Sequence, residues 1–124
     1  MITGRNAYMG NMVSTASPAR LLVLLYDRLV LDLQRAVDAQ NAGDFLAASP
    51  LLLHAQEIVL ELQASLRLDA WDGAAGLSGI YGWLHKEMVR ANVKRDVAAT
   101  MACLELVTPL ASAWREAALV TADQ

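Results

Sequence analysis

The sequence predicts an all-α protein: an antiparallel up-down-up-down four-helix bundle preceded by an N-terminal arm. The composition supports this class, because 56 % of the 124 residues are apolar and only three prolines and seven glycines interrupt the chain, which favours helix over sheet. Apolar residues recur at the spacing of one helix face in four successive segments. The connections between these segments are short, so consecutive helices should be antiparallel neighbours.

Residues 1–16 are expected to form the arm, and residues 17–124 the bundle. The arm is polar, carries one tyrosine, Tyr8, and contains Gly4 and Gly10, which weaken any helix. It has no apolar stretch of the kind that a secretory signal carries. The sequence leaves open whether this arm is flexible or docked on the bundle.

The first helix is predicted over residues 18–42. Ser17 is a good N-cap, and Pro18 at the first helical position loses no hydrogen bond, because its nitrogen would have no partner there in any case. Gly43 supplies the signal that ends the helix.

The second helix has two possible starts. Either Asp44 caps it and Pro50 bends it, or Ser49 and Pro50 repeat the Ser-Pro start of the first helix. It should end near Leu68, and residues 69–76 should form the main loop. The third helix is expected over residues 75–93.

The fourth helix should begin after Asp96, a plausible N-cap, and run to about Val120. A proline in a helix interior removes one backbone hydrogen bond. Pro109 therefore predicts a kink in the middle of this helix.

The first two helices carry apolar residues on two sides. At 100° per residue, Leu24 and Leu31 fall among polar residues on the first helix, and Leu53 and Leu60 do the same on the second. The expected core faces comprise Leu22, Leu25, Tyr26, Leu29, Leu33, Ala36 and Val37 on the first helix, Leu51, Ala55, Ile58, Leu62 and Leu66 on the second, and Leu77, Ile80, Tyr81, Leu84 and Met88 on the third.

Within each of these two leucine pairs the residues are seven positions apart. Three interpretations of the pairs are open. Isolated surface leucines are ordinary, since over half of a folded protein's surface is apolar. Aligned leucines could instead form a stripe that accepts a partner helix. The same stripe could hold a second copy of the chain in a structural homodimer.

Charge and cysteine content exclude several classes of protein. The net charge of −3 and the pI of about 5.2 argue against nucleic acid as a partner, because phosphate binding needs a basic face. No apolar run reaches the roughly 18 residues of a membrane span. The single cysteine, Cys103, indicates a reducing compartment, most simply the cytoplasm, and its apolar surroundings indicate an inert core thiol.

Motifs for enzymatic chemistry are scarce. The two histidines, His54 and His85, lack the Glu-x-x-His pairs of a bundle metal site, and no glycine-rich phosphate loop follows a strand. We therefore expect no metal, no cofactor and no enzymatic activity, and interpret His54 as a solvated or capping side chain.

One helix carries a further polar feature. Lys86, Arg90 and Lys94 step by four along the third helix, and form either a basic strip for an acidic partner or an ordinary solvated face. Asn92, near the core edge of the same helix, needs a hydrogen-bond partner, either within the bundle or on the backbone of a guest.

Several segments in order resemble one family. TASPARLLVLLYDRLVLDLQRA opens a leucine-rich helix with Ser-Pro and carries Leu-Tyr-Asp, and NAGDFLAASPLLLHAQEIVLELQASL follows with a Gly-Asp entry and an Ala-Gln pair. GIYGWLHKEMVRANVKRDV adds Ala-Asn and a later Asp, and ASAWREAA adds Ala-Trp. Together with Tyr8 in the arm, these motifs resemble the flagellar secretion chaperone family FliS over nearly the whole chain.

The resemblance implies a cytoplasmic export chaperone. Such a bundle binds the disordered C-terminal segment of flagellin, prevents premature polymerisation and aids delivery to the flagellar type III export apparatus, whose gate components are further candidate partners. We expect this chain to work as a monomer or weak dimer, and the resemblance implies no cofactor and no membrane insertion. The candidate guest contacts, from the stripes and the matching motifs, are Tyr8, Leu24, Tyr26, Leu31, Leu53, Gln56, Leu60, Tyr81 and Asn92.

Overall fold

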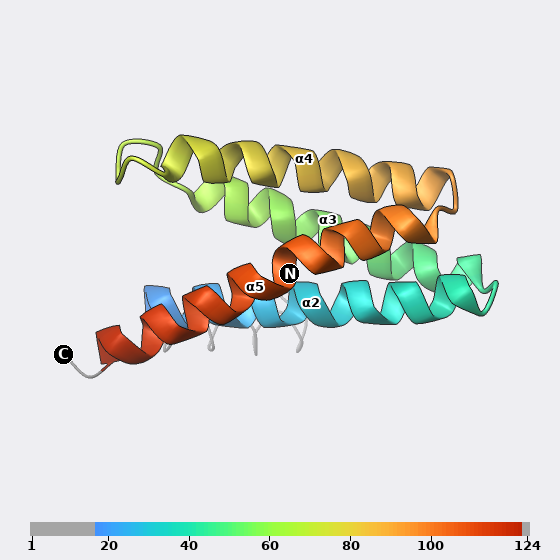
Figure 1. Ribbon diagram of the computed structural model, residues 1–124, viewed down its shortest axis with the longest axis horizontal. Helices are drawn as coiled ribbons and strands as arrows, with labels where there is room; N and C mark the ends of the chain where they lie inside the picture. Colours follow the sequence, from blue (N-terminus) through green and yellow to red (C-terminus); the bar gives the residue numbers. More distant parts are fainter. Residues whose placement is uncertain (1–16, 123–124) are drawn as a thin grey trace, which may run out of the picture.

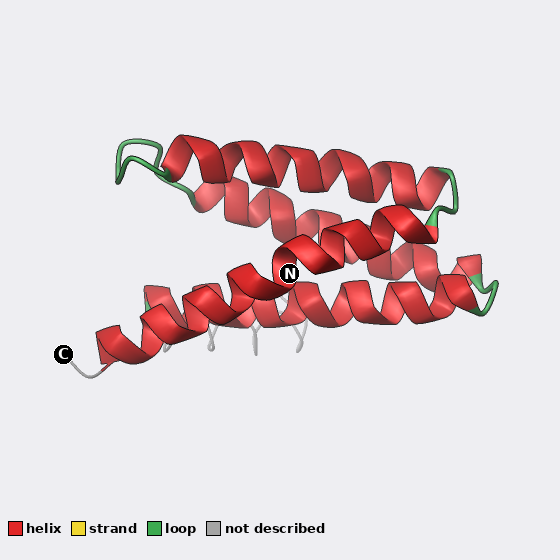
Figure 2. Cartoon of the chain, viewed as in Figure 1, coloured by secondary structure: helices red, strands yellow, loops and turns green. Residues whose placement is uncertain are grey.

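The computed structural model describes residues 17–122 and confirms the all-α four-helix bundle. Within this range the chain forms α2 (Pro18–Asn41), α3 (Phe45–Ser65), α4 (Ala74–Val93) and α5 (Val97–Ala122), joined by short connections and with no strand (Figures 1 and 2). The arm predicted over residues 1–16 lies outside the described residues.

The predicted start and stop signals lie at the two ends of α2. The Ser17 hydroxyl accepts a hydrogen bond from the backbone N–H of Arg20 at 3.1 Å, and Pro18 occupies the first turn. After Asn41 the chain reverses at Gly43, whose φ of +74° lies in the left-handed region that glycine adopts without steric cost.

The first of the two possible starts of α3 is correct. The Asp44 side chain accepts the backbone N–H of Ala47 at 3.1 Å, and the helix continues through Pro50. Proline leaves the carbonyl four residues earlier, that of Leu46, without its helical donor. The side chain of Leu46 is 91 % exposed, so this turn faces solvent and water can satisfy the carbonyl.

The end of α3 differs from the prediction, because the helix stops at Ser65 and not near Leu68. The Ser65 hydroxyl donates to the carbonyl of Leu62 at 3.0 Å, a local bond that competes with helix propagation. Leu66 is then extended (φ −76°, ψ 126°) and packs against the core.

The start of α5 follows the prediction. Asp96 Oδ1 accepts the backbone N–H groups of Ala98 at 3.0 Å and Ala99 at 3.3 Å, which caps the helix. Pro109 stands inside α5, which runs on to Ala122.

The helices do not pack equally on one another. α2 makes the most extensive contacts, with α5 on one side and α3 on the other, whereas α4 packs mainly on α3 and less on α5. In Figure 1, α5 crosses the bundle obliquely from the end of α4 to the start of α2. An ion pair between Arg115 and Asp27 joins the late part of α5 to α2.

Most of the expected core residues are buried. The core cluster comprises Tyr26, Leu29, Leu33, Ala36, Leu52, Ala55, Ile58, Val59, Leu62, Leu77, Tyr81, Leu84, Met88, Ala91, Ala99, Cys103, Val107 and Ala111. The expected core residues Leu22, Leu25, Leu51, Leu66 and Ile80 are only partly buried at its margin. Val37 is also only partly buried and lies outside the cluster, which corrects its assignment to the core. Leu52 and Val59, fully buried on α3, were missed, because α3 is apolar over a wider arc than one core stripe.

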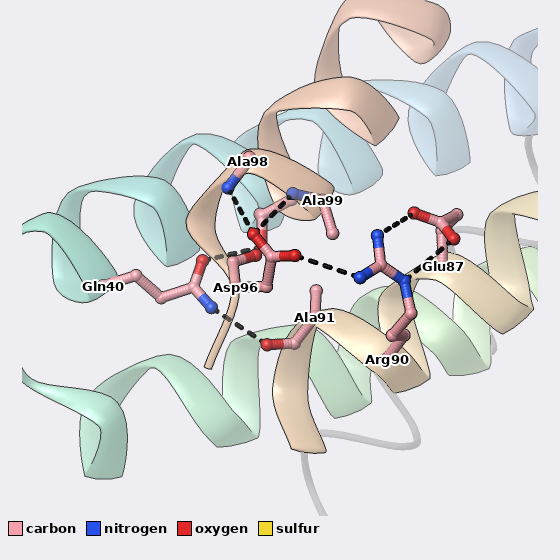
Figure 3. A network of polar contacts seen from close by, with 8 residues as sticks. Gln40, Glu87, Arg90, Ala91, Asp96, Ala98 and Ala99 are labelled. Carbon is pink, nitrogen blue, oxygen red and sulfur yellow. Dashed lines mark hydrogen bonds and ion pairs between the residues drawn. The ribbon is translucent and has the colours of Figure 1, made fainter. Parts of the chain in front are cut away.

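A polar network closes the corner where α4 meets α5 (Figure 3). Arg90 binds Glu87 at 3.0 Å and Asp96 at 3.0 Å, and the Arg90 guanidinium lowers the pKa of the Glu87 carboxyl. Gln40 of α2 donates to the carbonyl of Ala91 at 3.3 Å and accepts the hydroxyl of Thr100 at 2.6 Å. One buried amide thus ties α2 to both α4 and α5.

Two glycine substitutions should have opposite effects on stability. Gly43→Ala places a Cβ in a left-handed residue and should lower the free energy of unfolding by roughly 1–2 kcal/mol. Gly79→Ala, inside α4 where an added Cβ meets nothing within 4 Å, should raise it by about 1 kcal/mol. Urea denaturation followed by circular dichroism measures both, and a stabilising Gly43→Ala would contradict this assignment.

Candidate binding surface

The two leucine pairs lie outside the core. Leu24 and Leu31 are half-buried on α2 and do not belong to the core cluster. Leu53 and Leu60 on α3 are 50 % and 46 % exposed. Folding therefore leaves apolar area on both helices that the bundle does not use.

A polar cluster lies at the contact of α2 with α3. The fully buried carboxylate of Asp32 contacts His54 Nδ1 across the two helices. Its other oxygen lies 3.2 Å from Arg28 Nε, an ion pair one helical turn away. Leu24 precedes Arg28 by four residues and Leu31 follows it by three, so the three side chains lie about one turn apart along one side of α2.

The prediction of a solvated or capping His54 was therefore wrong, because its partner is a buried acid on another helix. The sequence did contain a signal. Asp32 falls on the core arc of α2, three residues after Leu29 and four before Ala36. A charged residue at a core position is stable only with a partner, and only the packing of α3 reveals which one.

Tyr26 and Tyr81 are inside the bundle. Both rings are buried, and their hydroxyl groups are hydrogen-bonded to each other at 2.7 Å. Burial raises the pKa of both phenols. In this conformation Tyr26 has no surface for a guest, which corrects the expectation that its side chain is an open contact.

An apolar cavity opens beside these tyrosines, where the start of α2, the end of α3, the start of α4 and the late part of α5 meet. Its volume is about 370 Å³, and its lining includes Leu21, Leu22, Leu25, Leu62, Leu66, Leu77, Tyr81 and Trp114. The indole ring of Trp114 lies 6.4 Å from the ring of Tyr26 between centroids. Its Nε1–H is buried inside the bundle, beside Tyr26.

The sequence did not predict this cavity, because its lining comes from four helices. Most of the leucines that line the cavity were predicted to lie on core faces. In the structure, however, Leu22, Leu25 and Leu66 are only partly buried.

The two amide residues differ in their contacts. Asn92 Nδ2 donates to Ser49 Oγ at 3.2 Å across α4 and α3, so the amide pairs within the bundle. Gln56 is 9 % exposed, and its side chain has no hydrogen-bond partner among the described residues. Tyr8 lies outside them.

The described residues contain no group of three or more His, Cys, Asp or Glu side chains that could hold a metal ion. Burial raises the pKa of the Cys103 thiol to about 12, so the thiol stays protonated and unreactive near neutral pH. Of the basic strip, Arg90 is engaged by Glu87 and Asp96, while Lys86 and Lys94 are exposed.

Two helices of the described chain are long and apolar enough to cross a bilayer by length and composition alone: Phe45–Ser65 and Val97–Val120. Core helices of bundles pass the same test. Here both helices contribute residues to the core cluster.

Comparison with known proteins gives a consistent result. A family model described as "Flagellar protein FliS" matches residues 1–121. The flagellar secretion chaperone FliS of Bacillus subtilis (strain 168) is 29 % identical over 111 residues, which cover 90 % of this chain and 83 % of the relative. A crystal structure described as a flagellar chaperone from bacteria matches with a TM-score of 0.74 at 21 % identity, over 93 % of this chain and 97 % of that one, and shows the same fold.

The pair formed by Asp32 and His54 gives a stability prediction. His54→Ala leaves a buried carboxylate without its partner on α3 and should lower the free energy of unfolding by roughly 1–3 kcal/mol. The matched control is His85→Ala, a half-buried histidine with no hydrogen bond among the described residues. Thermal melting compares the two variants, and equal melting temperatures would show that the contact contributes nothing.

Proposed function

Because this chain belongs to the FliS family and is a flagellar secretion chaperone, we propose that it binds the disordered C-terminal segment of flagellin in the cytoplasm. Bound in this way, the segment is kept from polymerising early and is handed to the flagellar type III export apparatus. The chaperone acts by binding alone, without a catalytic residue or cofactor.

The observation that carries the proposal is the apolar area that folding leaves outside the core. Ordering a disordered segment costs roughly 1–2 kcal/mol per residue in backbone entropy. Burying apolar surface returns about 25 cal/mol per Å². A guest of many residues therefore needs a long apolar track, and a single pocket is insufficient.

The track has two parts on this chain. The leucine pairs on α2 and α3 supply Leu24, Leu31, Leu53 and Leu60, which the core does not bury. The 370 Å³ cavity supplies a deeper apolar site.

The buried residues of the candidate set have supporting roles in this proposal. Tyr81 forms part of the cavity lining, and Tyr26 holds it there through the bond between their hydroxyl groups. Asn92 lies where α3 and α4 meet, and Gln56 and Tyr8 are further candidate contacts for the guest.

Binding to flagellin tests the proposed function directly. Isothermal titration calorimetry with flagellin of the same organism should give a dissociation constant of roughly micromolar or tighter, with an increase in helical circular dichroism on binding. Flagellin that lacks its C-terminal segment serves as the control and should not bind. If full-length flagellin does not bind, or if removal of the segment changes nothing, the proposal is wrong.

The α2 leucines give a test at residue level. Leu24→Ser combined with Leu31→Ser should weaken flagellin binding about tenfold, the equivalent of 1.4 kcal/mol, with little change in the melting temperature because neither residue belongs to the core. Leu29→Ser, in the core of the same helix, should instead lower the melting temperature strongly. A large melting loss in the double variant would place these leucines in the core.

A further inference from the structure

The same turn occurs twice at one end of the bundle. After α2 the chain reverses at Gly43, with a φ of +74°, and after α4 it reverses at Arg95, with a φ of +52°. The next residue is Asp44 in the first turn and Asp96 in the second. Its backbone N–H bonds to the carbonyl five residues earlier, at 2.8 and 2.9 Å, and its side chain caps the following helix. This turn is typical of glycine, so arginine is the departure.

Arg95 is therefore held in a backbone conformation that is costly for any residue with a Cβ. Strained residues of this kind persist where their surroundings fix them, and they cluster at binding sites. The guanidinium of Arg95 lies over the Phe45 ring, 5.1 Å from its centroid, a favourable contact for a cation. It has no ion pair with any of residues 17–122. The strained turn thus presents a guanidinium that an aromatic ring positions and that no acidic side chain neutralises.

This guanidinium lines a cavity of about 520 Å³ that opens between the two turns. Phe45, Leu46 and Val93 give the cavity apolar walls, and the last two are exposed. Asp44 is the one acid among the described residues that line it, and its side chain is engaged as the cap of α3. Guanidinium groups pair with carboxylates in fixed geometry. The cavity therefore suits a segment that carries a carboxylate next to a large apolar side chain.

The chain itself carries such a segment at its other end. The connection between α3 and α4 exposes Leu68 and Trp71, and Asp69 and Asp72 are exposed beside them. In Figure 1 this connection lies at the end of the bundle opposite to the two turns. The 21 residues of α3 separate the two sites by about 30 Å. The connection therefore cannot fill the cavity of its own copy, but it can enter the cavity of a second copy.

The two ends are also complementary in charge. At the cavity end Lys94 and Arg95 are exposed, and neither has an ion pair within residues 17–122. At the other end Asp69 lies 3.8 Å from Arg67, whereas Asp72 has no ion pair in the same part of the chain. Opposite charges on two surfaces favour their encounter and fix their register.

We propose that the α3–α4 connection of one copy binds in the 520 Å³ cavity of a second copy. In this contact the Asp72 carboxylate pairs with the Arg95 guanidinium, and the Trp71 ring packs between Phe45 and Val93. The contact is heterologous, so each copy in a pair keeps one free connection or one free cavity, and association continues head to tail beyond the dimer. It differs from a homodimer through the leucine stripes, and it does not depend on the proposed binding of flagellin.

Sedimentation equilibrium of the full chain without flagellin tests the proposal. The contact is small, so we expect a dissociation constant of about 0.1 mM. At protein concentrations well above this value the average mass of the wild type should exceed that of a dimer of the 13.4 kDa chain. A wild type that stays monomeric at these concentrations would overturn the proposal.

Arg95→Gly separates binding from stability. The change removes the guanidinium and also relieves the strained turn, so the melting temperature should stay the same or rise. Self-association should nevertheless weaken at least tenfold. Arg35→Ala is the matched control, because it removes the same charge from an exposed position on α2, and it should change self-association by less than twofold. Equal losses in the two variants would show that net charge alone is responsible and would overturn the proposal.

Trp71→Ala tests the other half of the contact, with the exposed Trp83 of α4 as the matched control. Trp71→Ala should weaken self-association at least tenfold, and Trp83→Ala should leave it within twofold of the wild type. If Arg95→Gly and Trp71→Ala both associate like the wild type, the copies meet through another surface and the proposal is wrong.

A mixture of two variants tests whether the two halves belong to one contact. Arg95→Gly keeps an intact connection, and Trp71→Ala keeps an intact cavity. Each variant should be monomeric alone, whereas the mixture should form one-to-one dimers that grow no further, because only one working pair of surfaces remains. A mixture that stays monomeric would overturn the proposal. Since flagellin is absent from all of these measurements, their failure and the failure of the proposed function are distinguishable.

Discussion

The hydrogen bond between the hydroxyl groups of Tyr26 and Tyr81 connects two helices, α2 and α4, that do not pack along one another. Trp114 of α5 packs against Tyr26, so three helices meet at one aromatic contact. The polar tips satisfy each other inside the core, where an unpaired hydroxyl would be costly. This contact holds Tyr81 beside the leucines of α2 and thereby shapes the apolar cavity. The candidate surface at this end of the bundle depends on it.

Buried polar side chains fix how the remaining helices lie against one another. Asp32 pairs α2 with α3 through His54, and Gln40 connects α2 with α4 and α5. Leucine-rich faces could pack in several rotations at similar free energy, whereas a buried polar group is satisfied in only one of them. In this bundle these contacts fix the rotation and the register of the helices. The exposed leucines are therefore not needed to hold the helices in place.

A bundle that must hold a disordered guest has to stay folded while apolar area remains uncovered. Here the two needs are divided among helix faces: the inward arcs of α2 and α3 form the core, and their outer stripes remain outside it. The division is clearest on α3, where Leu52 and Val59 are fully buried while Leu53 and Leu60, one position further along, are half exposed. Such a helix has a weak apolar periodicity, and this explains why its buried residues were only partly predicted.

The sequence by itself determined the helices and their order, because caps and breakers act locally: Ser17, Gly43, Asp44 and Asp96 mark ends that need no tertiary contact. It also indicated the second leucine stripes and, through motifs in order, the family. Only the tertiary structure decided that Tyr26 is buried, that His54 pairs with Asp32, and that Asn92 pairs with Ser49. Each of these depends on which helices are neighbours and on their register, and both are set by the packing of the whole core. The sequence of any single helix therefore does not reveal which helices are its neighbours or in which register they pack.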